Sequence, residues 1–328
     1  MLKLTAFKAL AILFISSMAL VSCNNDDNST PQPQEKTIAE IVAETPRFSI
    51  LLEAVQKTGL ESILNGSDQL TVFAPNNDAF AQLLQDQGIS GGVDGLIDAL
   101  GEDAVRNILL YHVLGGEVKA ADVPTGFVTT NGVYDGQSDE FLALYLNTAS
   151  GVVANGVSTV ITPDIDASNG VIHEIDVVLL PMNVLQIAQV DAGFSSLVSA
   201  VLAAEDDVVN RLGSETDVTT VFAPTNAAFA DLLDRAGVAS LDELVDAIGQ
   251  DGLTSVLLYH TVNGNVRSGD LMNGNVTTLQ GTDITINLDG DNPTITDGNG
   301  DVANIVATDV QGTNGVVHVI DFVIQPAP

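Results

Sequence analysis

The chain has 328 residues, of which 45% are hydrophobic, and it carries 43 acidic against 10 basic side chains. This length and composition suit two globular domains, whereas the net charge of −33 repels phosphate backbones and argues against a nucleic-acid partner. The single cysteine, Cys23, excludes disulfides within the chain and any cysteine-based zinc or iron–sulfur centre.

The first 22 residues have the pattern of an export signal. Lys3 and Lys8 precede an apolar segment that is shorter than the ~20 residues a membrane-spanning helix needs. Residues 20–23, Leu-Val-Ser-Cys, resemble the bacterial lipobox, in which the chain is cut before the cysteine and the cysteine is acylated. We therefore predict a signal peptide over 1–22 and membrane anchoring through a lipidated Cys23.

Residues 23–36 are predicted to form a solvated tether rich in Asn, Asp, Pro and Gln. The stretch 24–28, Asn-Asn-Asp-Asp-Asn, resembles the acidic signal that sends some lipoproteins of Bacteroidetes-type bacteria to the outer face of the cell. An ordinary polar spacer explains it equally well. The predicted localisation is the cell envelope, as an outer-membrane lipoprotein facing the cell surface.

The rest of the chain contains one unit twice. Thr-Val-Phe-Ala-Pro occurs at 71–75 and 220–224, Leu-Leu-Tyr-His at 109–112 and 257–260, and Asn-Gly-Val-(Ile/Val)-His-x-Ile-Asp at 169–176 and 314–321. The order is the same and the spacing differs only by short loops. A repeat of this kind predicts two copies of one domain, over 37–181 and 182–328.

In each copy, helices are predicted before strands. In the first copy, apolar residues at helical spacing indicate helices around 38–42 and 51–55, and a third over about 93–111. A short strand at 71–73 precedes a helix at 79–84, with Asn76 and Asn77, or Thr225 and Asn226 in the second copy, available to cap it. Strands are expected at 141–146, 151–161 and 171–180. The order implies an α+β fold with a mostly antiparallel sheet.

These three repeated motifs, in this order and spacing, resemble those of the fasciclin (FAS1) domain, and the two copies cover about 37–326. The resemblance implies two β-wedge domains with packed helices. It also implies a role in adhesion or in contacts with a surface or matrix, without catalysis and without a cofactor.

All four histidines belong to the repeated motifs. The resemblance makes Tyr111-His112 and Tyr259-His260 candidate binding residues, since this pair is implicated in integrin binding by animal relatives. The alternative is a Tyr and a His packed at a helix–strand junction, each bonded to a backbone group. A position at a helix C-terminus favours the charged imidazolium of His112 and His260.

His173 and Asp176, with His318 and Asp321 in the second copy, are predicted to be structural. Residues three apart on a strand point to opposite faces, so His173 and Asp176 cannot share one ligand. Asp164 and Ile165 follow Pro163 and resemble part of a second integrin-linked family motif. The neighbouring residues depart from that motif, the second copy has only Thr308-Asp309-Val310, and a plain loop before a strand is the alternative.

A calcium site is an open alternative at Asp297, Asn299 and Asp301, which fit positions 1, 3 and 5 of an EF-hand-like loop. The expected Gly and Glu of such a loop are replaced by Val302 and Thr308, and a Gly/Asn-rich hairpin turn is the simpler prediction. The acidic run 289–292 suggests the same two alternatives. No metal ligand is assigned.

Hydrolase, phosphate-binding and dinucleotide-binding signatures are missing from the sequence. We therefore predict a non-catalytic protein, anchored at the cell envelope, that binds a surface or matrix protein or a polysaccharide, with self-association possible. The alternatives are a constitutive structural component of an envelope complex, or a metal-dependent module or enzyme.

Overall fold

The structure, a computed structural model, describes residues 35–134, 139–290 and 292–328, and residues 35–328 form one compact unit. The predicted signal peptide, Cys23 and most of the predicted tether lie outside the described residues, as does Asp291. Among the helices of the described ranges, none is by itself long and apolar enough to cross a membrane. Val184–Val190 and Ala192–Ala203 reach the required length and hydropathy together but are bent by 101°.

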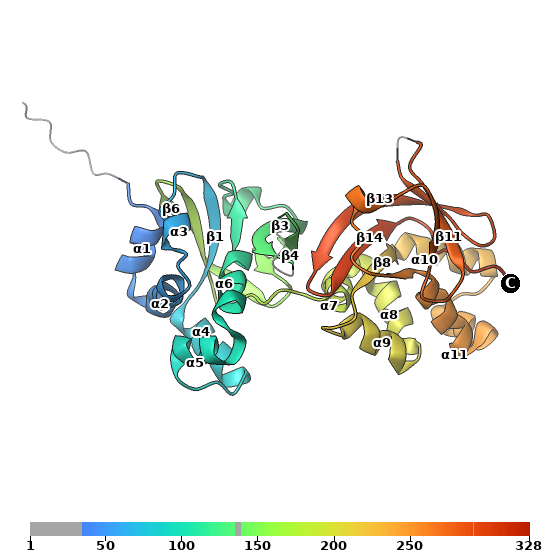
Figure 1. Cartoon of the computed structure of the whole chain (residues 1–328), viewed down its shortest axis with the longest axis horizontal. Coiled ribbons are helices and arrows are strands. Elements are labelled where there is room, and N and C mark those ends of the chain that lie inside the picture. The colour runs from blue at the N-terminus through green and yellow to red at the C-terminus, as the bar shows by residue number, and fades with distance from the viewer. Residues whose placement is uncertain (1–34, 135–138, 291) are drawn as a thin grey trace, which may run out of the picture. The chain divides into compact units, whose positions relative to one another are not determined.

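The first copy runs from helices into strands (Figure 1). Its elements are α1 (Ile38–Glu44), η1 (Pro46–Phe48), α2 (Ser49–Lys57), α3 (Glu61–Leu64), β1 (Leu70–Pro75), α4 (Asn77–Asp86), α5 (Gly92–Leu100), α6 (Glu102–Tyr111), β2 (Val113–Gly115), η2 (Ala120–Asp122), β3 (Gly126–Val133), β4 (Phe141–Asn147), β5 (Val153–Ala154), β6 (Ser158–Ala167) and β7 (Gly170–Ile175).

The second copy repeats this order. Its elements are α7 (Val184–Val190), η3 (Ala192–Phe194), α8 (Ser195–Ala203), α9 (Asp206–Gly213), β8 (Thr219–Pro224), α10 (Asn226–Ala236), α11 (Leu241–Tyr259), β9 (Thr261–Asn263), η4 (Ser268–Asp270), β10 (Gly274–Thr277), β11 (Asp283–Asn287), β12 (Thr294–Thr296), β13 (Val302–Gly312) and β14 (Gly315–Ile320).

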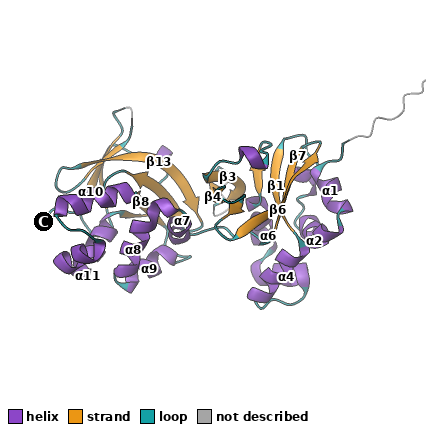
Figure 2. Ribbon diagram, turned by 180° about the vertical axis from the view of Figure 1, so that it is seen from behind, coloured by secondary structure: helices purple, strands orange, loops and turns teal. Residues whose placement is uncertain are grey.

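Each copy contains one seven-stranded sheet, and the two sheets have equivalent strand orders: β2-β1-β7-β6-β5-β4-β3 and β9-β8-β14-β13-β12-β11-β10. The pairs β1·β7 and β8·β14 are parallel, and the other neighbours are antiparallel. The predicted α+β class, with a mostly antiparallel sheet and packed helices, is therefore confirmed (Figure 2).

The strands β1 and β7 are buried on both faces. In β1, Val72 and Ala74 pack in the cluster formed with the helices, whereas Phe73 packs in a second cluster with side chains of β4 such as Leu144. Ile172 and Ile175 of β7 divide between the same two clusters. Because alternate residues point to opposite faces, one central pair of strands serves both halves of the core.

The repeated Asn-Gly of the third motif holds the helices to this central pair. Asn169 is buried; its Oδ1 accepts from the backbone N–H of Ile38 at 2.9 Å, and its Nδ2 donates to the carbonyls of Leu64 and Gly66, both at 2.9 Å. Gly170 has φ +135°, and a Cβ there would lie 1.9 Å from the carbonyl oxygen of Leu70. Only glycine lets the two strands approach this closely.

Of each predicted pair of capping residues, the first one caps the helix. The side chains of Asn76 and Thr225 accept from the backbone N–H groups of Ala79 and Ala228. The neighbouring Asn77 has another role: its amide bonds to the carbonyl of Pro46 and to Ser49, and so ties α4 to the start of α2.

Four predictions of secondary structure differ from the structure. The helix expected over 93–111 is broken at Gly101, which has φ +89°, and Gly249 with φ +77° kinks α11 at the equivalent place. The strand expected over 171–180 ends at Ile175, and β3 was not predicted. The residues Pro163-Asp164-Ile165, expected as a loop, lie inside β6, where the pairing with β7 is interrupted by register shifts.

Candidate functional site

The repeated tyrosines are fully buried at the ends of α6 and α11. The hydroxyl of Tyr111 donates to the carbonyl of Ala143 in β4 at 2.7 Å and accepts from Nδ2 of Asn155 at 3.0 Å. The hydroxyl of Tyr259 donates to the carbonyl of Asp283 in β11 at 2.8 Å. Each tyrosine therefore connects a helix terminus to a distant strand of the same copy. Burial raises the pKa of both phenols, which keeps them as hydrogen-bond donors.

The histidines that follow are equally buried and bridge two backbone segments. Nδ1 of His112 lies 2.7 Å from the carbonyl oxygen of Ile108, and its Nε2 accepts from the backbone N–H of Leu179 at 2.9 Å. In His260, Nδ1 lies 2.8 Å from the carbonyl of Val256 and Nε2 accepts from Ile324 N–H at 3.2 Å. An Nε2 that accepts carries no proton, so this geometry assigns the neutral, Nδ1-protonated tautomer.

Burial lowers the pKa of His112 and of His260 to about 4, against a smaller raising effect of the backbone carbonyl that each ring bonds. The expectation that the helix terminus favours a charged imidazolium was therefore wrong. Desolvation of a fully buried ring outweighs a helix dipole that is worth only ~1 kcal/mol.

Tyr111, His112, Tyr259 and His260 thus present no surface to a partner in this structure, with exposed fractions of 0–2%. Their role in binding stays a prediction. If mutation of these residues alters binding, the cause must be a shift of the strands and other backbone segments to which these side chains bond.

The second pair of histidines lies on the central strands β7 and β14. His173 packs against Phe73 with the rings tilted by 39° and their centroids 5.5 Å apart; its Nε2 lies 2.9 Å from the carbonyl of Val118, and its Nδ1 accepts from the backbone N–H of Asp164 at 3.2 Å. His318 has the equivalent contacts with Phe222, Val266 and Asp309. Burial is the main cause of the lowered pKa of His318.

Asp176 and Asp321 directly follow these two strands. Both are exposed and lie away from the buried histidines. Oδ1 of Asp176 accepts from the backbone N–H of Thr159, and Oδ1 of Asp321 from that of Asn304, both at 2.7 Å. Among the described residues, neither Asp176 nor Asp321 bonds a histidine; the carboxylate near His173 is Asp164, whose Oδ1 lies 3.9 Å from Nδ1 of the ring.

Asp164 and Asp309 occupy the same irregular position in β6 and β13. Both have positive φ, 57° and 62°, a conformation that Asp tolerates better than most residues. Oδ1 of Asp164 accepts from the backbone N–H of Ala120 at 2.8 Å, and Oδ1 of Asp309 from that of Ser268 at 2.7 Å. The Asp164 side chain is 41% exposed, whereas Ile165 packs against the helical core. The two copies therefore share this aspartate but not the other residues of the integrin-linked motif around it.

The acidic turn around Asp297 connects β12 to β13, so the predicted hairpin is confirmed. Oδ1 of Asp297 accepts from the backbone N–H groups of Asn299 and Asp301, and its Oδ2 accepts from that of Gln325, all at 2.9 Å. The carboxylate thus organises its own turn. Within the described ranges, no three His, Cys, Asp or Glu side chains are grouped to hold a metal ion.

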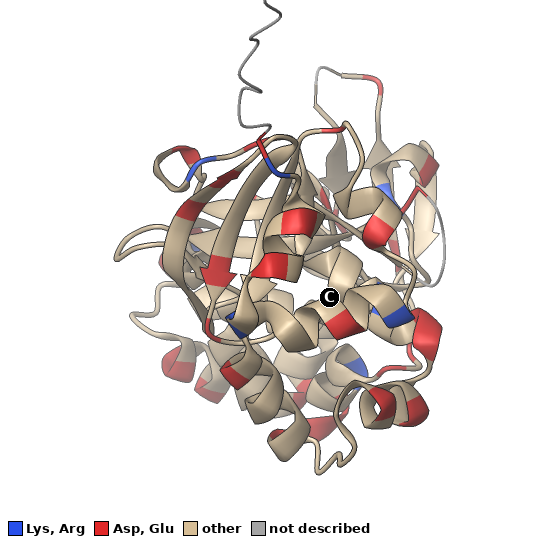
Figure 3. Cartoon of the chain, turned by 90° about the vertical axis from the view of Figure 1, so that its left-hand side faces the viewer, with Lys and Arg blue, Asp and Glu red and all other residues tan. Residues whose placement is uncertain are grey.

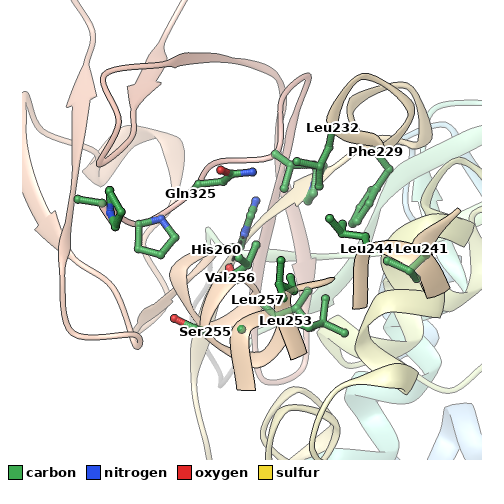
Figure 4. A pocket seen from close by; sticks show the side chains of 17 residues that line it. Phe229, Leu232, Leu241, Leu244, Leu253, Ser255, Val256, Leu257, His260 and Gln325 are labelled. Carbon is green, nitrogen blue, oxygen red and sulfur yellow. Dashed lines mark hydrogen bonds between the residues drawn. The ribbon is translucent and has the colours of Figure 1, made fainter. Parts of the chain in front are cut away.

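A cavity of about 280 Å³ lies in the second copy, between α10, both halves of α11 and residues 325–328 (Figure 4). The sequence offered no sign of it, because leucines at helical spacing predict a filled core equally well.

Acidic side chains are spread over helices and strands alike, with isolated Lys and Arg between them (Figure 3). The described basic side chains are largely paired with acids, as in Lys57 with Glu53 and Asp94. The surface thus offers a dispersed negative field rather than a focused charged site.

A duplicated α+β unit with these buried motifs defines a tandem-domain class of protein. The model of the fasciclin domain matches residues 46–181 and 192–326, and the chain belongs to the fasciclin domain family.

Two relatives and one solved structure define this similarity further. Protein sll1483 of Synechocystis sp. is 36% identical over 186 residues, which cover 55% of this chain and 96% of that protein. Human periostin is 30% identical over 272 residues; they cover 81% of this chain but only 29% of periostin. The FAS1 domain pair of the insect cell adhesion molecule fasciclin I has the same fold, with a TM-score of 0.50 and 21% identity over 82% of this chain and 94% of that structure.

Proposed function

We propose that this protein is a non-catalytic binding protein, held at the outer face of the cell envelope, that contacts a surface or matrix protein or a polysaccharide. One observation carries the proposal. The side chains best suited to proton transfer or metal binding, the four histidines, all bond backbone groups in the interior, in the same way in both copies. Membership of the fasciclin family and the likeness to a domain pair from a cell adhesion molecule support the same proposal.

The contact surface is proposed to include the irregular segments of β6 and β13. Asp164 and Asp309 are fixed there by their bonds to the backbone of residues 120 and 268, and they lie at the same place in each copy. A carboxylate held rigidly at a partly exposed strand edge loses little entropy on binding. Two equivalent sites on one chain raise avidity if the partner is repetitive, as a polysaccharide or a matrix is.

The test removes these charges without disturbing the fold. The double variant D164N/D309N keeps the oxygen that accepts from the backbone, and Asn tolerates positive φ as well as Asp. We expect attachment of cells that display this variant to fall at least several-fold, with an unchanged melting temperature. D98N, at an exposed helical position, is the matched control. Equal attachment by both variants contradicts the proposed surface, and purification in a complex of fixed stoichiometry favours a structural envelope component.

A further inference from the structure

The cavity of the second copy is walled by aliphatic and aromatic side chains. Phe229 and Leu232 come from α10, Leu244 and Ile248 from the first half of α11, and Leu253 and Val256 from its second half (Figure 4). The kink at Gly249 sets the two halves of α11 at an angle, so that both line one space. The apolar walls favour an apolar occupant.

The fourth wall is the segment 325–328, which is held at Gln325 by two backbone hydrogen bonds. The backbone N–H of Gln325 donates to Oδ2 of Asp297 at 2.9 Å, and the N–H of Gly298 donates to the carbonyl of Gln325 at 3.1 Å. Residues 325–328 therefore form part of the cavity wall.

The polar side chains that line the cavity are His260, Ser255 and Gln325. Both nitrogens of His260 are engaged with the backbone of Val256 and Ile324, so the ring offers no further hydrogen bond. The side-chain amide of Gln325 has no hydrogen bond to another residue in the described ranges, and Figure 4 places it beside His260 at the edge of the apolar walls. One amide is thus available to orient a ligand.

The first copy differs at the positions that shape this site. Counting back eight residues from the shared histidine, Gly252 replaces Ala104; counting four residues on from the shared aspartate, Gln325 replaces Leu180. A Cβ at Gly252 would lie 3.2 Å from Cβ of Ile248 on the cavity wall, so glycine lets the two halves of α11 approach. At these two positions the second copy has a glycine and a polar side chain, where the first has two aliphatic side chains.

We propose that this cavity binds one small, uncharged, mainly apolar molecule: an aromatic ring or a medium-length alkyl chain with a single hydrogen-bonding group. Its volume of about 280 Å³ exceeds the ~150 Å³ cavity that holds a benzene ring and falls just below the range for drug-sized ligands. An anionic ligand is disfavoured, because no cationic side chain lines the cavity and the exposed Asp246 and Asp251 lie on the same helix.

The experiment is calorimetric titration of the full chain with 1-octanol and, as a charged analogue, octanoate. We expect one saturable site for 1-octanol, with octanoate at least about tenfold weaker. V256F fills the cavity and should weaken 1-octanol binding by at least about tenfold, whereas L202F adds a similar ring at a side chain that is 63% exposed and should leave it unchanged. No saturable binding of 1-octanol, or equal binding by V256F and L202F, would overturn the proposal.

A second variant covers the case in which V256F does not fold. Q325L places the residue of the first copy at the cavity edge and removes only the amide. It should lower the affinity for 1-octanol several-fold through the lost hydrogen bond, with an unchanged melting temperature. Unchanged affinity in Q325L would contradict the assignment of Gln325 as the orienting group, and tighter binding of octanoate than of 1-octanol would contradict the ligand class.

Discussion

Single polar residues in this protein hold distant backbone segments together. His112 joins the end of α6 to Leu179, and Asn169 joins the start of β7 to both α1 and the end of α3. A buried donor or acceptor that loses such a partner costs ~1–3 kcal/mol. Repetition of these residues in both copies is therefore explained by folding alone, before any partner is considered.

The buried imidazoles make stability depend on pH. The pKa of His112 and of His260 is about 4 in the folded chain and ordinarily 6.5, so the unfolded chain binds more protons at intermediate pH. The contribution of each neutral ring is complete above pH 6.5 and is lost as pH falls toward 4. Between pH 7.5 and 5, urea titration should show a loss of about 2 kcal/mol for each histidine.

The double variant H112Q/H260Q provides the control for this prediction. Glutamine keeps one acceptor and one donor but does not titrate. Its unfolding free energy should be lower than that of the natural chain at pH 7.5, and it should change less between pH 7.5 and 5. Identical slopes for the two chains would show that other groups cause the pH dependence.

At the scale of elements, the parallel pair of strands in each copy depends on a glycine. Gly170 and Gly315 have φ +135° and +147°, and a Cβ there would lie 1.9 Å from the carbonyl of Leu70 and 1.8 Å from that of Thr219. Since β1 and β8 are the partners of β7 and β14, a side chain at either glycine would force the central pair apart.

G170A is therefore expected to destabilise the protein by at least about 2 kcal/mol, through steric overlap and positive φ together. G115A is the matched control: it lies at the exposed end of β2, where an added Cβ meets nothing within 4 Å, and it should change stability by no more than ~0.5 kcal/mol. Denaturant unfolding followed by circular dichroism measures both. A G170A protein as stable as G115A would refute the role given to the glycine.

At the scale of the whole molecule, the duplicated domain and the N-terminal segment serve the proposed function differently. Both copies use the same scaffold, yet two residues that line the cavity, Gly252 and Gln325, differ from their equivalents in the first copy. The proposed attachment to the envelope would depend on a short segment outside the described residues and on one cysteine, Cys23.

The proposed anchor is tested by C23A, with S29A as a control in the same segment. Without the thiol no acyl chain can be attached, and the strongly acidic domains have no affinity of their own for an anionic membrane. Membrane fractionation should find the natural chain and S29A with the membrane and C23A in the soluble fraction. Membrane association of C23A at the natural level would count against lipidation.

Local patterns in the sequence were enough to predict the repeat, the α+β class, the mostly antiparallel sheet and the caps at Asn76 and Thr225. Each of these depends on residue spacing or on the chemistry of one side chain beside its own backbone. The predicted element boundaries were wrong where a glycine with positive φ interrupts a helix, as at Gly101, or where an Asp has positive φ inside a strand, as at Asp164. Residue type permits these conformations but does not require them.

Only the tertiary structure decided the state of the histidines and the existence of the cavity. Both depend on burial, which is set by side chains far away in the sequence: His112 is neutral because α6 and the segment after β7 enclose it, against the tendency of its own helix. The space beside Gln325 exists because α10, the kinked α11 and the last residues of the described chain converge on it. The sequence determined which elements form, and their packing determined which side chains meet water.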